Sequence, residues 1–307
     1  MLYSEFRRGD CMEKYLLVAV SGILAGFLTR IALLRVDYRQ YPGYPHGFVT
    51  HLSMGFIAAS LGAIAVPALL KPDYAAFTFL ALAAQQFREI RSMERQTLES
   101  LEESELVQRG KDYIEGIART FEARNYLVMA TAFVTSLITQ FLGLLPGIAG
   151  GIVLVLISLL FKSGDTIGDI CEVVPAKLNF KDTILHVDHI NIMSVGLKDS
   201  RKKILHEGLG VILKPKNDDA RATIHDIGQR LAIAHTAATI LGTKKDIDMP
   251  EFTPMLRKDP DTGQVGFYIV PNEPDIKALI EAVKQAPVLE SAATRPLKSR
   301  AGRYASD

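Results

Sequence analysis

The sequence predicts a polytopic α-helical membrane region of about five spans, followed by a small cytoplasmic α/β (α+β) domain. Apolar residues make up 48% of the 307 positions and concentrate before residue 162 in blocks with few charges. After that point strand-like and helix-like segments alternate, as in a compact α/β or α+β domain. We therefore expect an N-terminal segment (1–14), a membrane region (15–162), a cytoplasmic domain (163–292) and a flexible basic tail (293–307).

The N-terminal segment is polar and precedes a second methionine, Met12. Arg7-Arg8-Gly9 is what a translated purine-rich ribosome-binding site would encode, so we expect Met12 to be the true start and the preceding residues to be untranslated. No small-residue cleavage site follows the first apolar block, which argues against a cleavable signal peptide. The two cysteines, Cys11 and Cys171, are far apart and lack a CxxC pattern, which disfavours a disulfide framework.

Five apolar segments are candidate spans. A span needs roughly 17–25 residues, so the third and fifth are the shortest candidates. The first span contains Arg30 near its end, where we expect the side chain to reach the membrane surface. The span interiors lack paired polar groups, which disfavours a transporter or channel. The segments are 15–34, 48–70, 74–87, 126–144 and 146–161.

The positive-inside rule orients these spans. With five spans, the arginines after the first and third spans and the basic residues after the fifth lie on one side. That side is then cytoplasmic, and the N-terminus lies outside. A polar helical hairpin, 88–125, also becomes cytoplasmic, with its break at Gly110. The residues that set the orientation are Arg35, Arg39, Arg88, Arg91, Arg95 and Lys162.

Small residues recur at four-residue spacing in the apolar region, at Gly22 and Gly26 and at Gly143, Gly147 and Gly151. Such spacing lets helices approach closely. It fits tight packing within one bundle, and it also fits a homo-oligomer.

The segment 111–124 has the spacing of an amphipathic helix, with Ile114, Ile117 and Phe121 on one face. Gly116 lies inside this helix at a cost of roughly 1 kcal/mol relative to alanine, and a close neighbour would explain that cost. We therefore expect the helix to pack against another element at the membrane surface. Tyr113, Gly116 and Arg119 are the predicted binding residues.

Carboxylates cluster near the predicted membrane surface. Asp165, Asp169 and Glu172 would share one face of a helix, and they could approach the carboxylates of the hairpin. Two carboxylates that share a proton are what aspartic proteolysis requires. The alternative is that these residues cap helices and turn the chain out of the membrane. The candidate catalytic residues are Asp112, Glu115, Asp165 and Asp169.

Other chemistry is weakly supported. Asp261-Thr262-Gly263 matches the tripeptide of soluble aspartic proteases but fits a hairpin turn better. The histidines lack metal-ligand spacing and no phosphate-binding P-loop is present, so we expect no metal, cofactor or nucleic-acid partner. The basic run of Arg201, Lys202 and Lys203 is interpreted as a solvated helix face. The histidines are His186, His189, His206, His225 and His235.

The cytoplasmic domain has clear element boundaries. We expect strands over 176–193, a short helix over 198–208 and a strand that stops at Pro215. One long helix should follow, capped by Asp218 or Asp219 and ended by Gly242. A hairpin over 252–272 and a final helix over 273–292 complete the domain. The long helix covers 218–242.

The stretch "KDYIEGIARTFEARNYLVM", together with "GLKDSRKKIL" and "GLGVILKPKN", resembles the YIEGIA family of endospore-forming Firmicutes. The resemblance implies a membrane protein linked to sporulation and supplies no catalytic residues. We interpret the chain as an integral membrane protein that anchors or regulates a protein partner at the cytoplasmic face. The alternative is a membrane-embedded aspartic-type protease that acts on a protein substrate at that face during sporulation.

Overall fold

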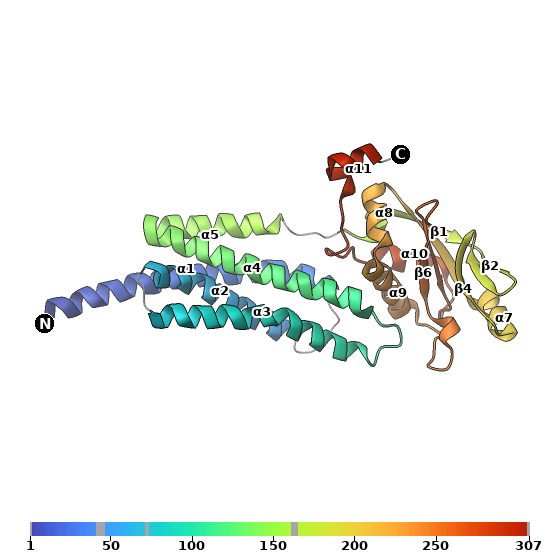
Figure 1. The fold of residues 1–307 in the computed structure, drawn as a ribbon, viewed down its shortest axis with the longest axis horizontal. Helices are drawn as coiled ribbons and strands as arrows, with labels where there is room; N and C mark the ends of the chain where they lie inside the picture. Colours follow the sequence, from blue (N-terminus) through green and yellow to red (C-terminus); the bar gives the residue numbers. More distant parts are fainter. Residues whose placement is uncertain (1, 41–46, 71–73, 161–164, 306–307) are drawn as a thin grey trace. The chain divides into compact units, whose positions relative to one another are not determined.

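The computed structural model describes residues 2–40, 47–70, 74–160 and 165–305 (Figure 1). The chain forms two compact units. We call Met1–Glu94 with Ala118–Ser163 the helical unit, and Arg95–Ile117 with Gly164–Asp307 the α/β unit. Two helices cross this division: the end of α3 (Tyr74–Glu102) and the start of α4 (Gly110–Leu142) belong to the α/β unit.

The helical unit is built from α1 to α5. Three described segments are long and apolar enough to cross a membrane: Tyr15–Leu34, Gly47–Leu70 and Gly110–Leu142. The five-span arrangement is therefore not confirmed. The expected third span is the first part of the long helix α3, and the expected fifth span is α5, which has only 16 residues. The helices are α1 (Leu2–Gln40), α2 (Gly47–Leu70), α3 (Tyr74–Glu102), α4 (Gly110–Leu142) and α5 (Leu144–Leu159).

Glycine and alanine allow these helices to pack closely. A Cβ atom on Gly22 would lie 2.6 Å from the carbonyl oxygen of Ala132, and one on Gly62 would lie 2.1 Å from that of Met129. Larger residues would push α1 and α2 away from the backbone of α4. The glycine spacing is thus used for packing within the bundle, and the expected homo-oligomer stays a prediction.

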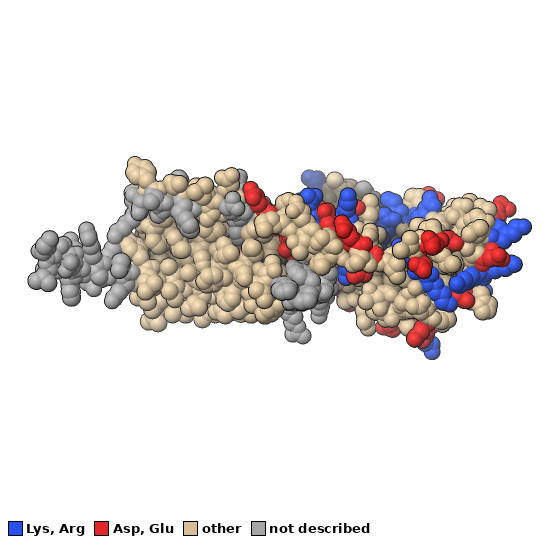
Figure 2. Space-filling model, turned by 90° about the horizontal axis from the view of Figure 1, so that it is seen from below, with Lys and Arg blue, Asp and Glu red and all other residues tan. Residues whose placement is uncertain are grey.

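The outer surface of the helical unit is apolar. Leu24, Leu28 and Ile57 are among its exposed side chains. On the face drawn in Figure 2, a broad part of this unit shows no Lys, Arg, Asp or Glu, whereas the α/β unit displays many of both signs. Such a surface suits lipid, which supports membrane association. Several residues used in the sequence analysis lie outside the described set. These are the side chains of residues 1–14, 35–40 and 86–88, and the whole of 161–164.

The α/β unit contains two antiparallel sheets. The larger has the order β1-β5-β7-β6, and the smaller has the order β2-β3-β4. Pro215 ends β5 as expected, and β6 and β7 form the expected hairpin. The strands are β1 (Cys171–Ala176), β2 (Leu178–Lys181), β3 (Ile184–Val187), β4 (Ile190–Ser194), β5 (Leu209–Pro215), β6 (Met255–Lys258) and β7 (Val265–Ile269).

The larger sheet lies between helices and the smaller sheet. In β5, Val211 and Leu213 pack in one core with α9 and α10, and Ile212 packs on the other side with β3 and β4. Gly266 allows the sheets to approach, because a Cβ there would lie 3.2 Å from the Cβ of Ile190. The helices of this unit are α6 (Ile167–Ile170), α7 (Lys198–Glu207), α8 (Asp218–His225), α9 (Ile227–Leu241), α10 (Ile276–Gln285) and α11 (Arg300–Ala305).

The prediction of one long helix over 218–242 is wrong, because the structure has two helices there, α8 and α9. Asp226 leaves the helical conformation (ψ 137°) and its carboxylate accepts a hydrogen bond from the amide of Gln229, which caps α9. The side chain of Asn217, rather than Asp218 or Asp219, caps α8. Gly242 ends α9 as expected. The expected flexible tail contains the short helix α11.

Candidate functional site

The hexapeptide Tyr-Ile-Glu-Gly-Ile-Ala occupies the first turns of α4. Tyr113, Ile114 and Ile117 are each less than 5% exposed, whereas Lys111 and Asp112 are exposed. The amphipathic face expected from the sequence is therefore confirmed. Because part of α4 belongs to each unit, these residues form the beginning of a helix that continues into an apolar segment long enough to cross a membrane.

Glycines mark the places where α4 meets the rest of the α/β unit. A Cβ on Gly110 would lie 2.6 Å from Cδ1 of Leu231, and one on Gly116 would lie 2.3 Å from Oγ of Ser291. The close neighbour expected at Gly116 is therefore the segment that follows α10. A Cβ on Gly228 of α9 would in turn lie 3.2 Å from the amide nitrogen of Tyr113.

Gln229 positions the segment that contacts Gly116. Its side chain is fully buried; Nε2 donates to the carbonyl oxygen of Pro287 at 2.9 Å, and Oε1 accepts from the amide of Leu289 at 2.8 Å. Both hydrogen-bonding groups of the amide are thus used to fix the chain two residues before Ser291. A buried amide that loses these partners costs free energy. Gln229 therefore helps to hold the segment on which the start of α4 packs.

The connection between α3 and α4 is also held by the α/β unit. The carbonyl oxygen of Val107 accepts a hydrogen bond from Nδ1 of His235 at 2.9 Å, and that of Leu106 accepts one from Nζ of Lys245. The side chain of Val107 belongs to the core beneath the larger sheet. Glu102 is buried and pairs with Arg109 across the connection. The break expected near Gly110 is present, and its loop is built into the fold.

The predicted catalytic carboxylates do not share one helical face. Asp165 precedes α6, Asp169 lies in this four-residue helix, and Glu172 lies in β1, so the expected common face is wrong. The Asp169 carboxylate accepts hydrogen bonds from the amide and hydroxyl of Thr166, at 2.8 and 2.9 Å. These bonds hold the pKa of Asp169 below its usual value. Asp169 therefore forms a capping box with Thr166, the N-cap of α6, in line with the alternative that the sequence left open. Its catalytic role stays a prediction.

The remaining predicted residues of the site, except Asp165, lie on α4. Asp112 is exposed in its first turn, Glu115 is half-buried and Arg119 is exposed. Asp165 is also exposed, and its carbonyl oxygen accepts a hydrogen bond from the amide of Val288. The catalytic and binding roles of these residues stay predictions.

Asp261-Thr262-Gly263 forms the turn between β6 and β7, as expected. Gly263 has a φ of +70°, and its carbonyl oxygen lies 3.0 Å from Nε2 of His225. Burial lowers the pKa of this histidine. Hydrogen bonds from Thr262 hold the pKa of Asp259 below its usual value. Among the described residues there is no group of three or more His, Cys, Asp or Glu that could hold a metal ion.

The basic run on α7 has structural contacts. Arg201 donates to the carbonyl oxygen of Asp182 at 2.7 Å, and the ammonium of Lys203 lies 5.1 Å from the ring centre of Phe252. Lys202 remains exposed beside Asp199, at 3.4 Å. Two of the three cations therefore have contacts within the fold, and Lys202 alone of the three matches the expected solvated helix face.

The helical unit contains a polar cluster that sequence reasoning missed. Arg30 is fully buried, so the expectation that it reaches the membrane surface is wrong. Its Nη2 atom donates to Nδ1 of His51 at 2.7 Å, and its guanidinium carbon lies 5.1 Å from the ring centre of Phe121. A paired polar group thus lies inside the bundle, contrary to the expectation for the span interiors. The lone Arg and His within apolar stretches were the available signal.

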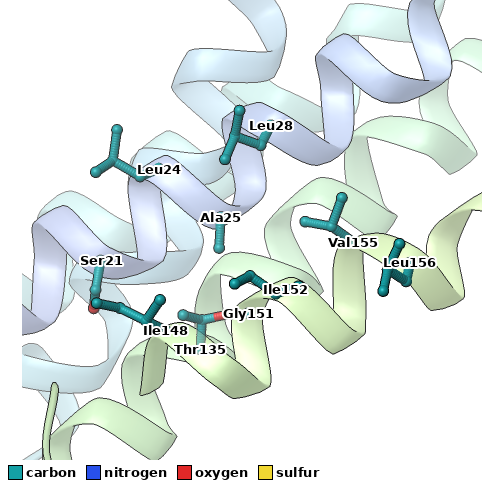
Figure 3. Close-up of a pocket in the computed structure, with 10 residues that line it drawn as sticks. All are labelled: Ser21, Leu24, Ala25, Leu28, Thr135, Ile148, Gly151, Ile152, Val155 and Leu156. Carbon is teal, nitrogen blue, oxygen red and sulfur yellow. The ribbon is translucent and has the colours of Figure 1, made fainter. Parts of the chain in front are cut away.

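An apolar groove lies between α1 and α5 (Figure 3). It has a volume of about 380 Å³ and Gly151 lies at its floor, where a Cβ would contact Ala25 at 3.2 Å. Ser21 and Thr135 supply its hydroxyl groups, and Ser21 lies 2.9 Å from the hydroxyl oxygen of Thr139. Its lining suits the hydrocarbon of a bilayer.

Comparison with known proteins shows the family of this chain. Residues 18–299 match the family model described as YIEGIA protein. The chain is 41% identical over 285 residues to the uncharacterized protein YphB of Bacillus subtilis (strain 168), which covers 93% of this chain and 96% of YphB. No solved structure matches the chain significantly. The protein therefore belongs to the YIEGIA family.

Proposed function

We propose that this protein is a sporulation-associated integral membrane protein whose α/β unit anchors or regulates a protein partner at the cytoplasmic face of the membrane. One observation carries the proposal. The tip of the α3–α4 pair is built into the α/β unit, and the same helix α4 continues as a segment that is apolar enough to cross a bilayer. A partner bound to the α/β unit is therefore attached to the membrane through α4.

The way in which the start of α4 packs within the α/β unit supports this role. A flexible linker would tether a partner equally well without burying Tyr113, Ile114 and Ile117 or using Gln229 to hold the contacting segment. The link to sporulation rests on the resemblance to proteins of spore-forming bacteria. The cytoplasmic location rests on the basic residues of the connecting segments. Besides the protein partner, we propose that the helical unit contacts the lipid bilayer.

The test compares sporulating cells that carry the native gene, a deletion, or single Asp112→Asn and Asp165→Asn variants at normal expression levels. A photoreactive amino acid at exposed positions of the α/β unit is used in parallel to trap neighbours. The new protein N-termini that cleavage creates are catalogued in each strain. We expect one protein to be trapped reproducibly, and we expect the set of new N-termini to be the same whether or not either aspartate is replaced. Cleavage products that disappear in the deletion and in an Asn variant would instead establish the aspartic-protease alternative.

A further inference from the structure

A cavity of about 480 Å³ lies in the α/β unit, between the α3–α4 connection and the C-terminal half of α9. This volume is within the range of sites that hold small ligands or side chains. Its walls contain hydroxyl, amide, imidazole and carboxylate groups. The lining residues are Ser104, Glu105, Leu106, Val107, His235, Ala238, Thr239, Gly242, Thr243 and Asn272.

The cavity offers hydrogen-bond acceptors beside its hydroxyl and amide groups. The carbonyl oxygen of Val107 can only accept, so Nδ1 of His235 carries the proton of their 2.9 Å hydrogen bond. In the neutral ring Nε2 then has the lone pair, and it lies 3.3 Å from the hydroxyl of Thr239. Of the ten lining residues, Glu105 has a carboxylate and none is Lys or Arg.

The end of α9 adds to the negative potential. Ala238, Thr239 and Gly242 line the cavity where this helix stops. The last carbonyl groups of a helix have no partner within it and carry a partial negative charge, which favours a cation. The nearby lysines are already engaged: Lys245 donates to the Leu106 carbonyl oxygen, and Lys244 pairs with Glu207 at 2.6 Å.

An exposed apolar side chain accompanies these acceptors. Leu106, which lines the cavity, is 47% exposed. We propose that this cavity receives a Lys or Arg side chain from a segment of the partner protein, with an apolar neighbour of that residue packed on Leu106. This inference rests on the proposed function and specifies the chemistry by which the partner is bound.

The test uses the full-length protein in detergent micelles and four immobilised peptide libraries. The libraries share the same randomised flanks and differ only at a fixed central residue, which is Lys, Arg, norleucine or Glu. We expect retention on the Lys and Arg libraries, with apolar residues enriched beside the centre. Glu105→Gln should weaken this retention about tenfold, equivalent to about 1.4 kcal/mol, and Ser104→Trp should abolish it by filling the cavity. Glu103→Gln changes a neighbouring exposed carboxylate outside the cavity and should have no effect.

Equal retention on the Lys and norleucine libraries would overturn the inference, as would equal effects of Glu105→Gln and Glu103→Gln. Displacement of the bound peptide by an equal concentration of n-butylammonium would also overturn it, because the ligand would then be a small amine rather than a protein segment. If the libraries fail while cells still show a trapped protein, the proposed function stands and only this binding mode is lost. If no protein is trapped, the proposed function fails.

Discussion

Gly116→Ala tests whether α4 packs on the segment after α10. In an ordinary helix interior, alanine is about 1 kcal/mol more favourable than glycine. Here the new Cβ would lie 2.3 Å from Oγ and 3.0 Å from Cβ of Ser291, which is closer than side-chain atoms approach. Overpacking of this kind costs about 1–3 kcal/mol. We therefore expect a net destabilisation of about 0–2 kcal/mol, obtained by subtracting the propensity gain.

The same substitution should reverse its sign when Ser291 is replaced by glycine. Ser291→Gly removes both atoms that the new Cβ would meet, so that only the helix-propensity gain of about 1 kcal/mol remains. The expected coupling free energy between the two positions is thus about 1–3 kcal/mol. Ser291→Ala serves as the intermediate case, since it removes the hydroxyl oxygen but leaves the Cβ at 3.0 Å from the new atom.

Hydrogen exchange of the α4 amides measures this coupling in the full-length protein. The free energy of local opening is obtained for the native chain, the two single variants and the double variant in detergent micelles. If Gly116→Ala stabilises α4 equally in both backgrounds, with a coupling below about 0.5 kcal/mol, the hexapeptide does not pack on this segment and the start of α4 is not built into the α/β unit.

Three further predictions concern buried groups. Burial raises the pKa of the Cys171 thiol to about 12, so in a Cys11→Ser chain maleimide should label it only after unfolding; rapid labelling of the native protein would contradict this. Burial lowers the pKa of His225, so the unfolded state binds more protons below its ordinary pKa of about 6.5. Stability should therefore fall on acidification below that pH, and His225→Gln should flatten the profile of hydrogen exchange in β7; an unchanged profile would refute it. The single variant His51→Leu should reduce the yield of folded protein more than the double variant Arg30→Met/His51→Leu, because the single variant leaves a buried guanidinium without its imidazole acceptor. The yield is measured as the folded peak in size-exclusion chromatography, and a larger loss for the double variant would refute this prediction.

Local patterns were sufficient for much of the fold. The face of Ile114, Ile117 and Phe121, the stop of β5 at Pro215 and the end of α9 at Gly242 follow from spacing or from one residue's backbone preference. These features depend on neighbours within about one or two helical turns. The break at Asp226 is the exception, because a capping side chain competed successfully with the helical pattern around it.

Contacts between distant segments could not be read from the sequence. The hydrogen bond between Val107 and His235 joins residues 128 positions apart, and nothing near either residue indicates it. The pairing of Arg30 with His51 joins two separate apolar stretches, and neither stretch alone indicates it, because a long side chain near the end of a span can also reach the membrane surface. The cost of a glycine inside a helix indicated that Gly116 has a close neighbour, but only the fold identifies Ser291.

The position of the proposed cavity gives Gly110 a specific importance. Glu105, Leu106 and Val107 line the cavity, and α4 begins at Gly110 with a φ of +79°. A side chain that enters the cavity therefore meets the connection that the hydrogen bonds from His235 and Lys245 hold in place. A non-glycine residue at this φ is strained, and a Cβ on Gly110 would also lie 2.6 Å from Cδ1 of Leu231. The start of α4 beside the cavity thus depends on glycine at this position.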